Sequence, residues 1–93
     1  MVSKINASHI LVKTDGEAYL ILQKIREGAS FEEMAKQKSI CPSGKRGGNL
    51  GWFGRNQMVK EFETAAFSAK KSQIIGPVKT QFGWHIIRID DVS

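Results

Sequence analysis

Two histidines and one cysteine are the side chains of this 93-residue sequence that most directly suggest acid–base or nucleophilic chemistry. His9 and His85 each lie inside an aliphatic run near opposite ends of the chain, and Cys41 lies between them. An imidazolium beside a thiol lowers the thiol pKa, so Cys41 could be a nucleophile with a histidine as its base. The alternative is an inert cysteine beside a structural pair of histidines, and no orienting acid can be assigned. The residues alone leave both interpretations open.

Other chemical sites are weakly supported by the spacing of these residues. A zinc ion bound by both histidines and Cys41 would lack the closely spaced ligand pairs of compact metal sites. Redox exchange through a Cys-X-X-Cys pair is excluded because the chain has one cysteine. The basic residues 44–47 match the Gly-X-X-Gly loop of nucleic-acid-binding KH domains, but the glycines that follow disfavour the helix such a loop requires. A Walker A loop is absent from the sequence.

The histidines would meet if residues 5–13 and 82–90 form neighbouring strands, since each histidine lies near the middle of its run. Between them, apolar residues at helical spacing from Ala18 onward predict an amphipathic helix that ends at Gly28. Ser30, with Glu33 three residues later, predicts a capping box and a second helix that ends before Pro42.

Shorter elements are predicted for the middle and the end of the chain. Residues 42–54 contain five glycines, which rules out a long helix, and residues 49–53 predict a short edge strand. Residues 59–69 predict a third helix, and residues 76–80 predict a brief strand before the last one. The order strand, helix, helix, strand, helix, strand, strand indicates an α+β fold with one small sheet covered by helices.

Length and composition predict a single globular domain spanning residues 1–93, with 41% hydrophobic and 25% charged residues. The chain has no run of about 18 apolar residues, and its first residues lack the apolar stretch of a signal peptide. With a lone cysteine, these features favour a cytoplasmic location, and we expect a monomer. The net charge of +5 is spread along the chain, so contact with nucleic acid or an anionic membrane should be weak and salt-sensitive.

Several segments, taken in order, resemble the parvulin family of peptidyl-prolyl cis/trans isomerases in its small, single-domain form. The resemblance covers residues 7–89. Its carriers are Ser8-His9-Ile10-Leu11-Val12, the run from Ser39 to Gly51, Gln57-Met58-Val59, Phe62 with Ala65-Ala66-Phe67, and the run from Gly76 to Ile87.

The resemblance implies a four-stranded antiparallel sheet covered by three to four helices, in the order βααβαββ with room for an extra short helix. The first and last strands would lie side by side at its centre. It also implies that His9 and His85 form a hydrogen-bonded dyad supported by Thr80, and that Cys41 faces the reacting peptide bond. Family resemblance therefore assigns the four residues His9, Cys41, Thr80 and His85 to the catalytic centre.

A proline pocket is implied by the same resemblance. Met58 and Phe62 would form it, with Leu50 nearby and Phe82 closing one side. From their spacing alone, Met58 and Phe62 would share a helix face and serve either the core or such a pocket. Rotation about an X-Pro bond breaks amide resonance and needs no covalent bond, cofactor or metal. Cys41 could attack the carbonyl, but an electrostatic role beside it is favoured.

Substrate preference is indicated by the short link after the first strand. Phosphate-directed parvulins carry a basic cluster in a long loop there, whereas this link offers Lys13 alone, opposed by Asp15 and Glu17. We therefore expect an isomerase that acts on proline-containing peptides and unfolded proteins, assisting folding, without phospho-Ser/Thr-Pro specificity. Two alternatives stay open: a chaperone-like module that binds proline segments with little turnover, and a basic domain that associates with nucleic acid or anionic membranes.

Overall fold

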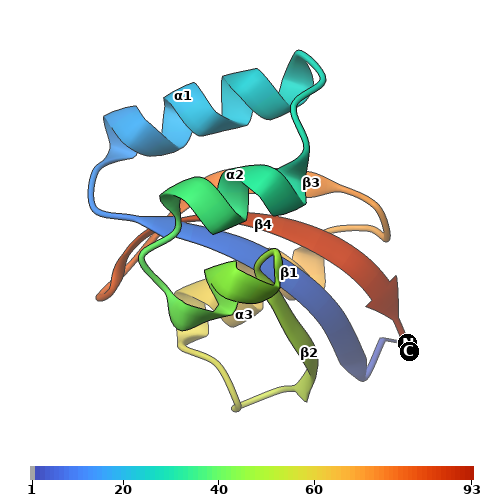
Figure 1. The fold of residues 1–93 in the computed structure, drawn as a ribbon. Coiled ribbons are helices and arrows are strands. Elements are labelled where there is room, and N and C mark those ends of the chain that lie inside the picture. Colours follow the sequence, from blue (N-terminus) through green and yellow to red (C-terminus); the bar gives the residue numbers. More distant parts are fainter. Residues whose placement is uncertain (1) are drawn as a thin grey trace.

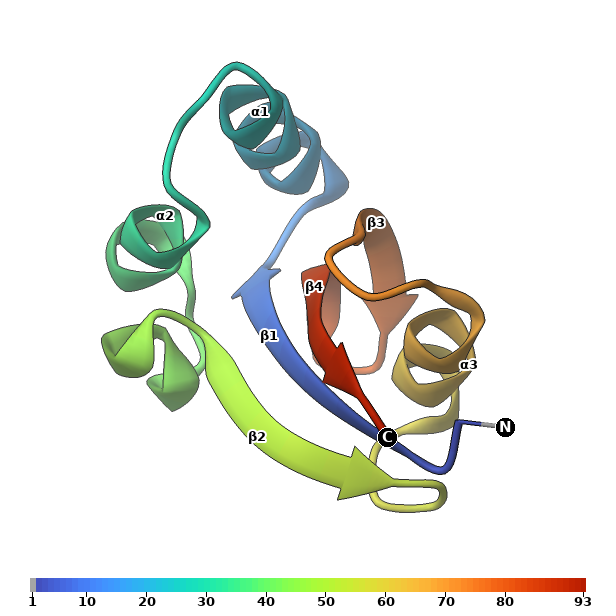
Figure 2. The same cartoon turned by 90° about the vertical axis from the view of Figure 1, so that its right-hand side faces the viewer.

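The computed structural model describes residues 2–93 and consists of one four-stranded sheet with helices on both faces (Figures 1 and 2). The strands are β1 (Lys4–Val12), β2 (Asn49–Gly54), β3 (Ile74–Thr80) and β4 (Gly83–Val92). The helices are α1 (Asp15–Arg26), α2 (Phe31–Lys38), α3 (Lys60–Ser68) and the short 3-10 helix η1 (Pro42–Arg46). Every strand pair is antiparallel and the order is β2-β1-β4-β3, which confirms the predicted α+β fold with β1 and β4 at the centre.

The pairing of β1 with β4 brings the two histidines together diagonally. His9 is opposite Ile87 and His85 is opposite Leu11, so each histidine lies two residues from the other's cross-strand partner. Because side chains alternate along a strand, both rings point to the same face of the sheet. The predicted strands were correct to within two residues at each end.

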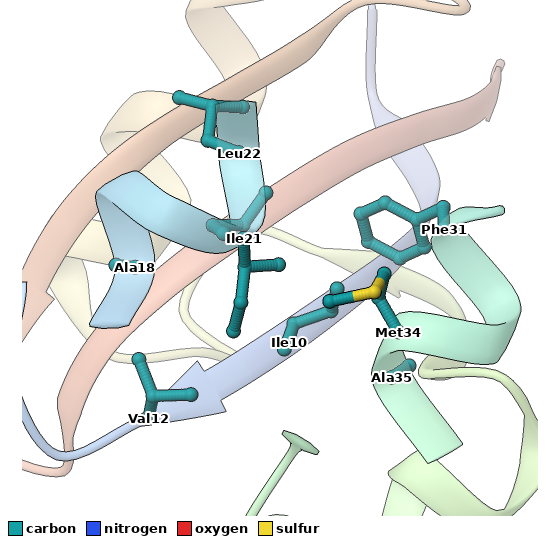
Figure 3. Close-up of a cluster of buried hydrophobic side chains, with 9 residues drawn as sticks. Ile10, Val12, Ala18, Ile21, Leu22, Phe31, Met34 and Ala35 are labelled. Atoms are coloured by element: carbon teal, nitrogen blue, oxygen red, sulfur yellow. The ribbon is translucent and has the colours of Figure 1, made fainter. Parts of the chain in front are cut away.

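Each face of the sheet carries its own hydrophobic core. Helices α1 and α2 cover one face, and α3 covers the other (Figure 2). Figure 3 shows the first core, which contains Ile10, Val12, Ala18, Ile21, Leu22, Phe31, Met34, Ala35 and Ile86. The second core contains Ile5, Ala7, Phe53, Phe62, Ala66, Ile87 and Ile89. A sheet buried on both faces holds its central strands rigidly, which suits them to carry a site.

Helices α1 and α2 both begin at a hydroxyl cap, of which Ser30 was predicted, whereas Thr14 was predicted as part of a turn. The Thr14 hydroxyl accepts from the Glu17 N–H at 3.2 Å, and the Ser30 hydroxyl accepts from the Glu33 N–H at 3.2 Å. The Glu33 carboxylate pairs with Lys36 at 3.5 Å instead of returning to the Ser30 N–H, so only half of the capping box is formed. Within residues 2–93, no helix is long and apolar enough to cross a membrane.

The two edge strands are less regular than the central pair. β2 is the predicted edge strand, and its pairing with β1 shifts register opposite Ala7 and Ser8. β3 begins at Ile74, two residues before the predicted start, and its pairing with β4 is interrupted between Ile75 and Val78. Pro77 lies in that interruption, where its missing N–H costs no ladder hydrogen bond.

Candidate functional site

An apolar cavity of about 610 Å³ opens on the α3 side of the sheet. It brings together the four residues predicted to bind substrate with three of the four predicted catalytic residues, and Thr80 lies behind it. Among the residues that the structure describes, the cavity wall contains no Asp, Glu, Lys or Arg side chain. The lining residues are His9, Leu11, Ile40, Cys41, Pro42, Leu50, Gln57, Met58, Val59, Phe62, Phe82 and His85.

The histidine dyad forms the floor of this cavity. The two Nδ1 atoms are 2.9 Å apart, and His85 Nε2 lies 2.7 Å from the Thr80 hydroxyl. That hydroxyl accepts from the Phe82 N–H at 3.1 Å, and it keeps its proton and one lone pair for the bond to His85 Nε2. With both rings neutral, one of the two Nδ1 atoms carries the proton of the bond between the histidines, and the tautomer of each ring depends on which one it is. The predicted support of the dyad by Thr80 is therefore matched by the geometry.

Both histidines are neutral at pH 7. His9 is 5% exposed and His85 is 3% exposed. Burial lowers the pKa of each from 6.5 to about 4, and for His9 the charge that His85 would carry lowers it further in the same direction. His9 Nε2 is buried without a hydrogen-bond partner among the described residues. A neutral dyad cannot act on Cys41 as an imidazolium would.

Cys41 is positioned by the backbone that leads from α2 to η1. The Ile40 N–H donates to the Leu11 carbonyl at 2.8 Å, and the Ser39 hydroxyl accepts from the N–H groups of Leu11 and Cys41 at 3.1 and 3.3 Å. These bonds attach the segment to the end of β1, beyond the reach of β2. Within residues 2–93 the Cys41 sulfur accepts from the Ser43 hydroxyl at 3.3 Å and bonds to neither histidine. A cysteine nucleophile with a histidine base has no supporting contact.

Leu50 enters the cavity because β2 bulges at that residue. Ala7 pairs with Gly51 and Ser8 pairs with Asn49, so Leu50 has no partner on β1. The Asn49 side chain holds the bulge from both sides, since its Oδ1 accepts from the Gly51 N–H at 3.1 Å and its Nδ2 donates to Asn6 Oδ1 at 3.1 Å. Gly51 has a φ of +76°, which glycine adopts without strain.

Phe62 joins the cavity to the second core. Its ring stands edge-on to both imidazoles, with centroids 5.7 Å from His9 and 5.3 Å from His85. It is 2% exposed, whereas Met58, two residues before α3, is half-buried and Phe82 at the rim is 58% exposed. The spacing of Met58 and Phe62 left open whether they belong to the core or to a pocket. In the structure Phe62 belongs to both the second core and the cavity wall, and Met58 lines the cavity.

Sequence reasoning missed two groups of residues around this cavity. The additional wall residues are Leu11, Ile40, Pro42, Gln57 and Val59, and the supporting residues are Ser39 and Asn49. A glycine inside a strand pattern, as at Gly51, was the available signal for the bulge. Nothing local in the sequence marks the contact of Ser39 with β1, because its partner there, Leu11, is 28 residues away. No three His, Cys, Asp or Glu side chains of residues 2–93 lie together as metal ligands.

Comparison with known proteins places this geometry among prolyl isomerase domains. Residues 9–91 match the family model described as "Rotamase: PPIC-type PPIASE domain". Foldase protein PrsA of Geobacillus sp. (strain WCH70) is 52% identical over 95% of this chain and 32% of its own length. This chain therefore spans about a third of the length of such relatives.

Solved structures agree in fold over nearly the whole chain. The crystal structure of the peptidylprolyl isomerase PrsA from Bacillus anthracis superposes with a TM-score of 0.96 at 46% identity, over 99% of this chain and 43% of that chain. The solution structure of NmPin, the parvulin of Nitrosopumilus maritimus, gives a TM-score of 0.85 at 43% identity, over 96% of this chain and 97% of that chain.

Proposed function

This chain belongs to the PPIC-type, or parvulin, family of peptidyl-prolyl cis/trans isomerases, and from that membership we propose that it accelerates rotation about X-Pro bonds of client polypeptides and so assists their folding. The observation that carries the proposal is the apolar cavity, free of Asp, Glu, Lys and Arg within the described chain, with a neutral histidine dyad as its floor. Such a cavity accepts a proline ring and excludes water.

Catalysis by this cavity follows from the electronic structure of the amide. The planar X-Pro amide carries a partial negative charge on oxygen and a partial positive charge on nitrogen, and twisting the bond removes that separation at a cost of roughly 18 to 20 kcal/mol. Water stabilises the planar form more than the twisted one, whereas an apolar wall reduces that difference. Each gain of about 1.4 kcal/mol is a tenfold acceleration, and no covalent intermediate is required.

The residues around the cavity have separate roles in this proposal. Leu50, Met58 and Phe62 hold the proline ring, and the exposed Phe82 covers it from the rim. Cys41 places a polarizable sulfur at the wall, held by Ser43, where it acts on the carbonyl electrostatically. The dyad fixes the shape of the floor through its hydrogen bonds, and proton transfer by the histidines is not part of the proposal.

No strong preference for phospho-Ser-Pro or phospho-Thr-Pro is proposed. Only Lys13 and Thr14 separate β1 from α1. The Thr14 hydroxyl caps α1, and the Asp15 carboxylate accepts from the Gly16 N–H at 2.8 Å. This short link is occupied by helix capping and contains one cation, so it cannot form a multidentate phosphate clamp.

A protease-coupled isomerisation assay on a panel of X-Pro peptides tests the proposal. We expect turnover of Ala-Pro and Phe-Pro peptides, comparable with that of a phospho-Ser-Pro peptide. Met58→Ala should reduce turnover, while Leu20→Ala, which truncates a 56%-exposed apolar side chain of α1 away from the cavity, should not. Peptide binding without turnover would instead support the chaperone-like alternative, and a phospho preference above about twentyfold would refute the substrate assignment.

The wider context of the domain is also a proposal. PrsA relatives are named foldases and are about three times longer than this chain. Unfolded proteins as clients, a monomeric state and a cytoplasmic location stay predictions. Association with nucleic acid or anionic membranes through the +5 charge would show as binding that weakens steeply between low and physiological salt.

A further inference from the structure

A second hollow of about 350 Å³ adjoins the proline cavity and has a different chemical character. The ridge formed by residues 40–42, which contains Cys41, lines both spaces. Beyond the ridge, the second hollow is lined by Lys36, Ser39, Gly44 and Lys45. A polypeptide whose proline occupies the apolar cavity therefore has a basic, hydroxyl-bearing recess next to it.

Three polar side chains that line this hollow can donate hydrogen bonds: Lys36, Ser39 and Lys45. The Ser39 hydroxyl already accepts from the Leu11 and Cys41 N–H groups, so its own proton is the group it has left to offer. The exposed Lys45 side chain has no carboxylate within salt-bridge distance among residues 2–93. Lys36 pairs with Glu33 at 3.5 Å, but both side chains are more than half exposed, and such pairs are weak enough for another carboxylate to compete.

Resting on the isomerase function proposed above, we propose that this hollow is a subsite for an acidic side chain, Asp or Glu, of a client residue within two positions of the proline. Lys45 supplies the main charge and the Ser39 hydroxyl supplies a directed hydrogen bond. The carbonyl end of α2 lies near Lys36 and brings about half of a negative elementary charge. The positive charges of the two lysines together outweigh this partial negative charge. Lys45 lies on η1 and is therefore not part of α2.

The preference should be modest because the lysines are solvated. Exposed ion pairs correspond to about a two- to fivefold change in affinity. A phosphoserine in the same position would gain by a similar small factor, which is consistent with the absence of a multidentate phosphate clamp. The subsite would thus bias the choice of client sequence without restricting the enzyme to it.

Matched peptides and matched lysine variants test the subsite. Peptides carry Glu or Gln at one of the two positions before proline or the two after it, and both Kd and kcat/KM are measured at about 50 mM salt. Wild type should prefer Glu over Gln by about two- to fivefold at one position. Lys45→Gln should abolish that preference. Lys24→Gln removes the same charge from the exposed face of α1, and should retain it.

The measured Kd values separate a subsite at Lys45 from a general effect of charge. Equal Kd values for Glu and Gln peptides at all four positions would overturn the subsite. Equal loss of preference in the Lys24 and Lys45 variants would also overturn it, because the effect would then come from the net charge of the protein. A Glu preference in Kd with no turnover of any peptide would leave the subsite standing and refute the isomerase function instead.

Discussion

Lowering the pH from 7 to 4.5 should destabilise this fold through its histidine dyad. Burial lowers the pKa of both His9 and His85 from 6.5 to about 4. The unfolded chain therefore binds protons at the two histidines below pH 6.5, whereas the folded chain binds them only near pH 4. The stability that the neutral dyad contributes is fully present above pH 6.5, and it is lost as the pH falls toward 4.

The expected loss is large for a domain of this size. Each pH unit in this window costs about 1.4 kcal/mol per histidine, so the dyad should cost about 5 kcal/mol between pH 7 and 4.5. Small domains are stable by about 5 to 15 kcal/mol in total. Most of the window belongs to the dyad, because Glu32 and Asp91, whose pKa values the fold lowers, lose their stabilising contribution only as the pH falls through their unfolded values of 4.5 and 3.8.

Urea denaturation followed by tryptophan fluorescence at half-unit steps of pH measures this loss, and NMR titration of the imidazole resonances measures the two pKa values directly. His9→Asn removes one titrating group, so its unfolding free energy should fall with pH by about half as much. An unfolding free energy that stays constant within about 1 kcal/mol from pH 7 to 4.5, or imidazoles that titrate near 6.5, would refute the reasoning.

Three substitutions around the cavity carry further predictions. Met58→Ala should lower kcat/KM for an Ala-Pro peptide by about tenfold, because about 1 to 2 kcal/mol of apolar contact with the proline is lost. The Tm should change little, since Met58 is half-buried. Unchanged turnover would show that Met58 is not part of the proline pocket. Cys41→Asp should retain activity within about tenfold if the sulfur acts electrostatically, and complete loss in a protein with unchanged circular dichroism would favour a nucleophile. Asn49→Ala should raise KM several-fold because the bulge that directs Leu50 loses its bond to the Gly51 N–H; an unchanged KM would show that strand register alone places Leu50.

The central strands could be predicted from the sequence because their signal is local. Family resemblance predicted that the first and last strands pair, and the aliphatic runs around His9 and His85 predicted each strand locally. Capping residues such as Ser30 predicted helix starts for the same reason. Such sequence signals extend over a few residues, because the side-chain-to-backbone hydrogen bonds that produce them join residues only a few positions apart.

The walls of the site could not be predicted in this way. Cys41 reaches the cavity because Ile40 bonds to the carbonyl of Leu11, a backbone contact that any residue type could make. The Leu50 bulge depends on an Asn49 side chain that reaches across to Asn6, 43 residues earlier. Family resemblance supplied these positions, because it carries the long-range contacts that local physics does not encode.

The dyad occupies positions that the pattern of the sheet assigns to the core. His9 follows Ile5 and Ala7 on the buried face of β1, and His85 precedes Ile87 on β4. Apolar residues there would avoid the pH-dependent loss of stability, so we expect the histidines to serve the cavity. A charged floor would stabilise the charge-separated planar amide and slow rotation, whereas a neutral floor does not. Activity should therefore follow the folded-state pKa values of about 4, while stability declines from 6.5. Between those values, kcat/KM of the folded protein should stay constant as Tm falls, and a parallel decline of both would refute the role of a neutral floor, because the folded dyad stays neutral there.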